Sequence, residues 1–151
     1  MRFPVPHYPQ EHPTSCIPAT VRMVLSFWGI DRSEPVLSRI LQSEEEGTSV
    51  FNIEFLQEAG LGVTVWVGEM DVDALKQSLD QGTPVIVTVW TDALPYWTIN
   101  RPHALVVVGY DEREVYLNDP KFPDAPKSVS WDSFLVAWEG FGRFGAIIGK
   151  Q

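Results

Sequence analysis

Two residue types that proteins use for cross-links and metal sites are scarce in this 151-residue sequence, which has one cysteine and three histidines. A single cysteine excludes an internal disulfide, so the fold does not depend on an oxidising compartment. No run approaches about 18 uninterrupted apolar residues, so no membrane-spanning helix is expected. Residues 1–13 have no apolar core of signal-peptide length. We therefore expect a cytoplasmic protein.

Positive charge is scarce as well. Lys and Arg number 11 and Asp and Glu 20, which gives a formal net charge of -9. This excess of negative charge argues against nucleic acid and anionic membrane surfaces as partners. It would attract a cationic peptide, but it is also the kind of charge that keeps many cytosolic proteins in solution. The charge therefore fixes neither the partner nor the oligomeric state.

The apolar pattern predicts helices mainly in the first half of the chain and strands mainly in the second. Apolar residues at three- and four-residue steps indicate a first helix over 17–28, with Thr14 or Ser15 as its cap and Gly29 at its end. Further helices are expected at 34–42, 49–59, 72–81 and after Ser130, and strands at 62–67, 84–90, 103–110, 114–119 and 144–149. This segregation predicts one α+β domain over residues 1–151 rather than a βαβ parallel sheet.

The one cysteine, Cys16, lies at the start of the first expected helix, in the segment QEHPTSCIPAT. A thiol in the first turn of a helix faces unpaired backbone N–H groups and the positive end of the helix dipole, and both favour the thiolate. A free cysteine is also one of the residue types most often buried in a core. Its position alone therefore leaves Cys16 as either a nucleophile or an inert core residue.

A nucleophilic thiol needs a base, and His103 is the best-placed histidine. His7 and His12 lie in a Pro-rich lead-in, whereas His103 opens an apolar strand. The expected hairpin of 103–110 with 114–119 would bring Asp119 within a couple of residues of the position opposite His103, where it could orient the imidazole. The sequence does not fix the register of the turn, and a histidine at this position is also an ordinary polar strand end.

Two further features lie near these residues in the chain. Gln10, six residues before Cys16, could join the Cys16 N–H in binding a developing oxyanion, although a lone glutamine is unremarkable. Tyr96 and Trp97 belong to the aromatic loop VWTDALPYWTINRPH, which leads into His103. They are expected near the cleft, either as packing residues or as substrate contacts.

The ordered set Gln10, Cys16, His103 and Asp119 resembles that of the papain-like cysteine peptidases. It is similar in particular to cysteine peptidase family thirty-nine, the bacteriocin-processing or double-glycine-leader peptidases, and its stand-alone relatives. In that family a Q…CGPA segment begins the nucleophile helix, and a later H…VVGY…V…DP hairpin carries the base and its orienting acid. Here the matching segments are QEHPTSCIPAT and HALVVVGYDEREVYLNDP, and the similarity spans nearly the whole chain.

The resemblance implies a papain-like fold, with an N-terminal nucleophile helix packed on an antiparallel sheet, and a peptidase that acts on a peptide or protein. In this interpretation Cys16 attacks the carbonyl, and His103 removes its proton and later protonates the leaving amine. Asp119 orients His103, while Gln10 and the Cys16 N–H bind the oxyanion. The resemblance implies neither a metal nor an organic cofactor.

One position departs from the family pattern. The family usually has Gly after the nucleophile, whereas this sequence has Ile17. A β-branched side chain there would crowd the substrate cleft or stiffen the oxyanion turn, so Ile17 is expected to contact substrate and to slow turnover. Two alternatives to a peptidase stay open: a non-catalytic relative that binds a peptide, and a transpeptidase or amide transferase that uses the same thioester chemistry.

Overall fold

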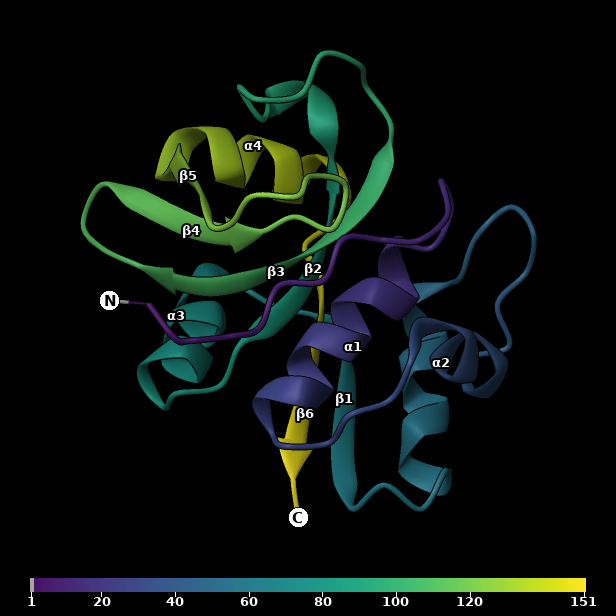
Figure 1. Ribbon diagram of the computed structural model, residues 1–151. Helices are drawn as coiled ribbons and strands as arrows, with labels where there is room; N and C mark the ends of the chain where they lie inside the picture. Colours follow the sequence, from purple (N-terminus) through teal and green to yellow (C-terminus); the bar gives the residue numbers. More distant parts are fainter. Residues whose placement is uncertain (1) are drawn as a thin grey trace.

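The computed structural model describes residues 2–151, which contain one six-stranded sheet (Figure 1). The strands are β1 (Val63–Glu69), β2 (Val85–Trp90), β3 (Pro102–Tyr110), β4 (Glu114–Asn118), β5 (Lys127–Ser130) and β6 (Phe144–Lys150). They lie in the order β1-β6-β2-β3-β4-β5, and every neighbouring pair is antiparallel. The predicted α+β class and antiparallel sheet are confirmed.

Helices cover both faces of this sheet (Figure 1). On one face lie α1 (Cys16–Phe27), α2 (Glu34–Ile40), which packs against α1, and the 3-10 helix η1 (Val50–Glu58), which packs against β1. The other face is covered by α3 (Val72–Asp80) and α4 (Trp131–Gly140), and a one-turn 3-10 helix η2 (Thr91–Ala93) follows β2. Within residues 2–151, none of the helices combines the length and the apolar character needed to cross a bilayer.

The alternation of side chains along the central strands separates two apolar cores. Ile86 of β2 and Val106 of β3 belong to the core beneath α1, whereas Val87 and Leu105 belong to the core beneath α3 and α4. Successive side chains of a strand point to opposite faces of a sheet. The uninterrupted apolar runs of β2 and β3 are therefore explained by burial on both faces.

Most predicted elements form within a few residues of their expected bounds, with three differences. The segment predicted as a helix over 49–59 is a 3-10 helix, and both β5 and η2 are too short to show a periodicity in the sequence. Ser15 occupies the N-cap position of α1, but its hydroxyl bonds to the backbone of His12 rather than to a helix N–H. The hydroxyl of Thr14 donates to Glu45 O, so the predicted side-chain cap is wrong.

Trp138 of α4 is fully buried in the second core, the one beneath α3 and α4. We expect Trp138→Ala to lower the free energy of unfolding by about 3–5 kcal/mol, because it removes an indole from a packed core. The measurement is chemical denaturation followed by circular dichroism. Trp66→Ala is the matched control, since Trp66 is 45% exposed on β1, and its loss should be much smaller. Equal losses in the two variants would contradict the assignment of this core.

Candidate active site

Cys16 is the first residue of α1, so its thiol lies at the positive end of a 12-residue helix. The chain reaches this point through a loop that contains four prolines among residues 4–13, and Pro18 follows in the first turn, where its missing N–H costs nothing. The thiol is free and half-buried. It therefore remains accessible while it faces the unpaired N–H groups of the first helical turn.

The hairpin of β3 and β4 brings His103 and Asp119 together. Val106 pairs with Asn118, and continuing this register places Asp119 opposite Leu105, two residues from His103. His103 Nε2 lies 2.6 Å from Asp119 Oδ1, and both side chains are almost completely removed from solvent. Asn118 points elsewhere, donating from Nδ2 to Val5 O. The expected adjacency of His103 and Asp119 is therefore present in the structure.

Asp119 is fully buried, and its carboxylate is surrounded by donors. The hydroxyl of Tyr96 donates to Oδ2 at 2.7 Å and the indole N–H of Trp97 donates to the same oxygen at 2.9 Å. The backbone N–H of Lys121 donates to Oδ1. Burial alone would raise the pKa of Asp119, but its bond to His103 and the bonds from Lys121 and Trp97 lower it below the ordinary value. Asp119 is thus held as a carboxylate.

His103 lies between this carboxylate and the thiol. Its Nε2 is bound to Asp119, which leaves Nδ1 as the ring nitrogen available to Cys16. The ring of Trp97 packs edge-on against the imidazole, with ring centroids 4.8 Å apart. Burial would lower the pKa of His103, but hydrogen bonds to Asp119 and Cys16 outweigh it and raise the pKa from 6.5 to about 9. The imidazole is therefore protonated at neutral pH.

Tyr96 and Trp97 were predicted as substrate contacts. The structure places both against Asp119, and neither lines the cavity that contains Cys16 and His103. Sequence reasoning missed their bonds to Asp119, because the fold of the long loop between β2 and β3 decides where these side chains point. Their contact with a substrate stays a prediction.

The lead-in segment, here called the N-terminal arm (residues 2–10), runs along β3 and the loop after β4. Phe3 N donates to Val108 O, His7 Nε2 donates to Phe122 O, and Gln10 N donates to Pro120 O at 2.7 Å. The last of these bonds fixes Gln10 beside the residue that follows Asp119. The arm therefore brings the fourth predicted site residue to the same end of the sheet as the other three.

The side-chain amide of Gln10 is already engaged. Its Nε2 donates to His12 O at 2.9 Å and to Pro13 O at 3.1 Å, while its Oε1 is buried and has no partner among the described residues. A glutamine amide has only two N–H donors. In this arrangement the amide binds its own loop, and donation to an oxyanion would require Nε2 to give up one of these carbonyls.

Ile17 lies in the core rather than free in the cleft. It is 3% exposed and packs with the apolar residues beneath α1, although one side of it borders the cavity next to Cys16. Its bulk is therefore largely absorbed by core packing. Contact with substrate, and the expected effect on turnover, stay predictions.

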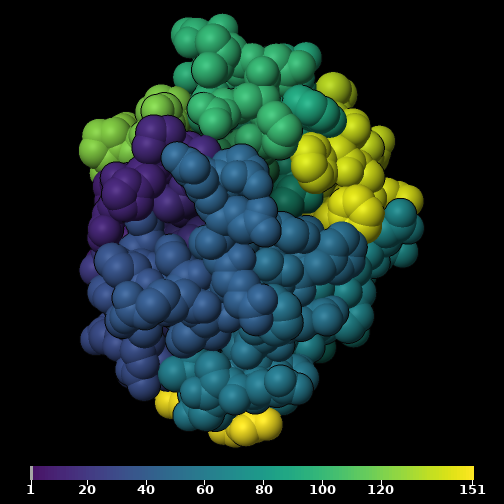
Figure 2. Space-filling model, turned by 90° about the vertical axis from the view of Figure 1, so that its right-hand side faces the viewer, coloured from purple at the N-terminus to yellow at the C-terminus, as the bar shows by residue number. Residues whose placement is uncertain are grey.

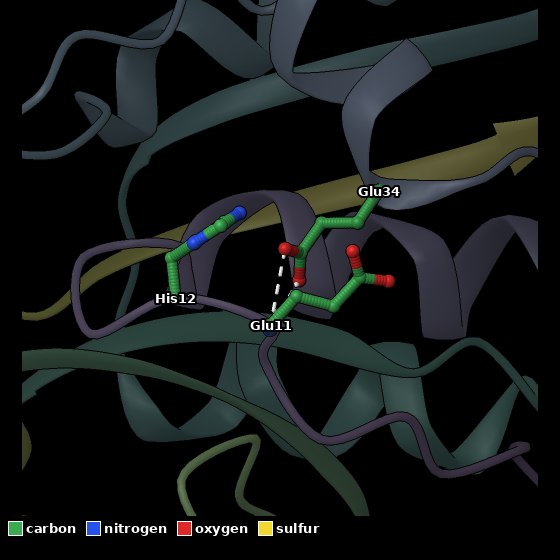
Figure 3. A group of neighbouring side chains, drawn as sticks. All are labelled: Glu11, His12 and Glu34. Carbon is green, nitrogen blue, oxygen red and sulfur yellow. Dashed lines mark hydrogen bonds between the residues drawn. The ribbon is translucent and has the colours of Figure 1, made fainter.

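A buried acidic residue that sequence reasoning did not single out supports the loop before Cys16 (Figure 3). Glu34, at the start of α2, is 1% exposed, and both of its carboxylate oxygens lie 3.2 Å from the backbone N–H of Glu11. Burial raises the pKa of Glu34, an effect that the bond from Glu11 partly offsets. A glutamate that follows a serine at the start of a helix is usually an exposed residue of the first turn. The sequence therefore gave no sign that Glu34 is buried and binds the backbone of Glu11.

Glu11, His12 and Glu34 are also, within residues 2–151, the group whose side chains could hold a metal ion, with potential ligand atoms within 4.8 Å of one another. Two of the three already have other partners, since Glu11 pairs with Arg22 at 3.4 Å and Glu34 binds the Glu11 N–H. The group therefore has a structural explanation as an anchor of the loop that carries Gln10.

The sequence of residues 3–146 matches the Peptidase_C39-like family. The match covers nearly all of the chain and includes the segments of Cys16, His103 and Asp119. The chain belongs to the peptidase C39-like family. No curated protein matches the sequence at a significant level.

Solved structures of C39 peptidases share this fold. The peptidase domain of Streptococcus ComA, a bifunctional ABC transporter of a quorum-sensing pathway, superposes with a TM-score of 0.79 at 20% identity, covering 97% of this chain and 99% of that one. A protein from Bacillus anthracis described as C39-like gives 0.77 at 17% identity, covering 98% and 96%. A double-glycine-motif protease from an AMS/PCAT transporter, solved with its leader peptide, gives 0.76 at 16% identity, covering 99% and 94%. The papain-like C39 fold is therefore confirmed.

The raised pKa of His103 makes a prediction about the pH dependence of stability. The pKa is 6.5 for an unperturbed histidine and about 9 in the fold, so the folded protein holds the proton more tightly than the unfolded chain. The stabilisation is complete below about pH 6.5 and is lost as the pH rises through 9. We expect the difference in unfolding free energy between the native protein and His103→Gln to shrink over that interval in urea titrations.

A companion measurement checks the cause. In an NMR titration of the native protein, the His103 imidazole should titrate near pH 9. In Asp119→Asn the pKa of His103 should be lower, because the burial that lowers this pKa is no longer offset by the charge of Asp119. A native His103 that titrates near 6.5, or one that Asp119→Asn leaves unchanged, would contradict the assigned pair.

Proposed function

We propose that this C39-like chain is a cysteine peptidase that hydrolyses a peptide bond through an acyl-enzyme formed on Cys16. The observation that carries this proposal is the buried His103–Asp119 pair in contact with a half-buried thiol at the start of α1. A buried imidazolium destabilises the fold unless an opposite charge lies beside it. Asp119 supplies that charge to His103, and a histidine that served only packing would need no thiol on its other side. The arrangement has the nucleophile, base and orienting acid that thiol acyl transfer requires.

The proposed cycle balances with these groups alone. The Cys16 sulfur, as thiolate, attacks the substrate carbonyl while the imidazolium of His103 donates its proton to the leaving amine. The C–N bond breaks, and a thioester remains on Cys16. Neutral His103 then takes a proton from water, whose oxygen attacks the thioester. The C–S bond breaks, the carboxylic acid leaves, and the Cys16 thiolate and the His103 imidazolium are restored. Asp119 keeps the ring oriented and stabilises the imidazolium in both half-reactions.

A peptide is the substrate class that the proposal implies. One structural relative is a protease with a leader peptide bound to it, which supports a peptide in the corresponding cleft here. The charge of -9 would favour approach by a basic peptide. Water serves as the acyl acceptor in this proposal.

One observation favours a second candidate, a non-catalytic relative that binds a peptide in the same cleft. The amide of Gln10 is bonded to His12 O and Pro13 O rather than free to meet an oxyanion. Losing one oxyanion donor typically costs on the order of 10² to 10³ in rate. If the Gln10 amide stays bound to His12 O and Pro13 O during acylation, the rate falls by about 10² to 10³, whereas the affinity for the peptide is unchanged.

The reactivity of the thiol tests the peptidase candidate, because a protein that only binds a peptide needs no activated thiol. Because Cys16 is the only cysteine, a single mass addition by iodoacetamide reports on it directly. We expect rapid alkylation of the native protein well below pH 8, and slower alkylation in His103→Gln. Modification that is equally slow in both proteins would contradict an activated thiol.

Cleavage then distinguishes the peptidase from the binding protein. We expect a peptide library incubated with the native protein to yield fragments, and Cys16→Ala to yield none. Gln10→Ala should lower kcat by about 100-fold or more with little change in KM, because the donor acts on the transition state. Gln81→Ala, an exposed glutamine after α3, is the matched control and should leave kcat unchanged. A reactive thiol without any cleavage would favour the peptide-binding candidate.

A further inference from the structure

The cavity that contains Cys16 and His103 has a volume of about 500 Å3, and a threonine of β2, Thr88, forms part of its wall. The cavity lies where residues 46–51, the ends of β2 and β3 and the turn between α4 and β6 come together. Figure 2 shows these segments as blue, green and yellow surfaces that meet. A peptide whose carbonyl is held at Cys16 therefore occupies space that Thr88 borders.

Thr88 differs from the other hydroxyl side chains that line the cavity. Those of Thr14, Thr48 and Ser49 each form a hydrogen bond with another part of the chain, at 2.9, 2.6 and 3.2 Å. Thr88 Oγ1 is buried and has no hydrogen-bond partner within residues 2–151. Because Thr88 lines the cavity, a molecule bound there can reach this hydroxyl.

Packing alone does not explain a threonine at this position. Thr88 is 6% exposed, and every other residue of β2, whose sequence is VIVTVW, is apolar. A valine has the same β-branched shape and no hydroxyl to satisfy. A buried polar group that loses its water and gains no hydrogen bond destabilises a fold, which is why nearly all such groups in native proteins have a partner. The position of Thr88 in the cavity wall makes a bound substrate the available partner.

The pairing of β2 with β3 places Thr88 one step along the sheet from the imidazole. Val89 is in register with His103, and Thr88 is in register with Ala104. Ile86, two residues before Thr88, belongs to the core beneath α1, so the side chain of Thr88 points to the face of the sheet that α1 covers. The methyl group of Ala104, which also lines the cavity, offers the hydroxyl no hydrogen-bonding atom.

We propose that the Thr88 hydroxyl forms a hydrogen bond with a main-chain peptide group of the substrate, close to the carbonyl held at Cys16. A hydroxyl can donate to a peptide C=O or accept from a peptide N–H, and both groups are present whatever the side chains of the peptide. The fold gives up stability at Thr88 when the cavity is empty, and a bound peptide supplies the missing hydrogen bond. The inference rests on the proposed function for its effect on cleavage, and on the cavity alone for its effect on binding.

Thr88→Val removes the hydroxyl and keeps the shape of the side chain, so it should affect stability and activity in opposite directions. We expect the Tm of the protein without peptide to rise by about 2–4 °C, because a buried polar group without a partner is replaced by a methyl group. The kcat/KM for a peptide that the native protein cleaves should fall about three- to tenfold, the effect of losing one hydrogen bond between neutral groups. Thr88→Ser, which keeps the hydroxyl, should recover part of this loss.

Thr20→Val is the matched control for stability. The Thr20 hydroxyl is also fully buried, but it donates to Ile17 O at 2.8 Å. The same substitution there removes a hydrogen bond that exists, so the Tm of Thr20→Val should fall rather than rise. A Tm that falls in both variants would show that the Thr88 hydroxyl is satisfied without a substrate, and it would overturn the inference.

Binding to the inactive Cys16→Ala protein separates this inference from the peptidase proposal. The probe is the library peptide that binds Cys16→Ala most tightly in fluorescence anisotropy, prepared again with one amide at a time replaced by an ester. An ester lacks the N–H and its carbonyl is a weaker acceptor, so it perturbs a bond of either kind. At one position the ester should lower the affinity about three- to tenfold, and the same ester should have no effect in the double variant Cys16→Ala/Thr88→Val.

The outcomes of this scan distinguish the two proposals. An ester effect that depends on the Thr88 hydroxyl supports the inference even if the native protein cleaves nothing, in which case only the peptidase proposal fails. An ester scan that is the same with and without the hydroxyl, or a library without any peptide that binds, would overturn the inference. Cleavage by the native protein together with an unchanged kcat/KM in Thr88→Val would overturn it as well, while the peptidase proposal stands.

Discussion

A carboxylate that is completely removed from water needs its charge matched by hydrogen bonds, and Asp119 imposes that requirement on the surrounding chain. The long loop between β2 and β3 folds so that Tyr96 and Trp97 both donate to one oxygen of Asp119. The other oxygen takes His103 and the backbone of Lys121. These contacts fix the imidazole by its neighbours on three different segments rather than by its own strand alone.

Cys16, on the other side of the cleft, is held by a different set of contacts. Cys16 is positioned by α1, which rests on the sheet through its apolar face, and by the loop before it, which is held by buried Glu34. The same loop presents its carbonyls to Gln10. The thiol of Cys16 and the side-chain amide of Gln10 are therefore held by α1 and the loop before it, whereas His103 and Asp119 are held by the β3–β4 hairpin. The cavity that contains Cys16 and His103 borders both parts.

The sequence predicted the parts of this site that depend on local pattern and on strand pairing. The helix start at Cys16 follows from periodicity and prolines, and the closeness of His103 and Asp119 follows from a hairpin whose two strands are both strongly apolar. The bonds from Tyr96 and Trp97 could not be predicted, because they depend on the path of an irregular loop of eleven residues between two strands. Glu34 was missed for a similar reason, since its burial results from the way α2 packs on α1. The bonds of Gln10 to the carbonyls of His12 and Pro13 also depend on the conformation of an irregular loop, which the pattern of apolar residues does not predict.

The bonds of the N-terminal arm to Val108, Pro120 and Phe122 join residues 2–10 to residues more than 100 positions later in the sequence. His103 and Asp119 likewise lie far along the chain from Cys16. Cys16 is therefore synthesised long before the hairpin that carries His103 and Asp119, and contacts of such large sequence separation form late in folding. Until that hairpin is complete, Cys16 is a thiol without an imidazole beside it. The topology therefore delays the contact between the thiol and the imidazole until β3 and β4 have paired.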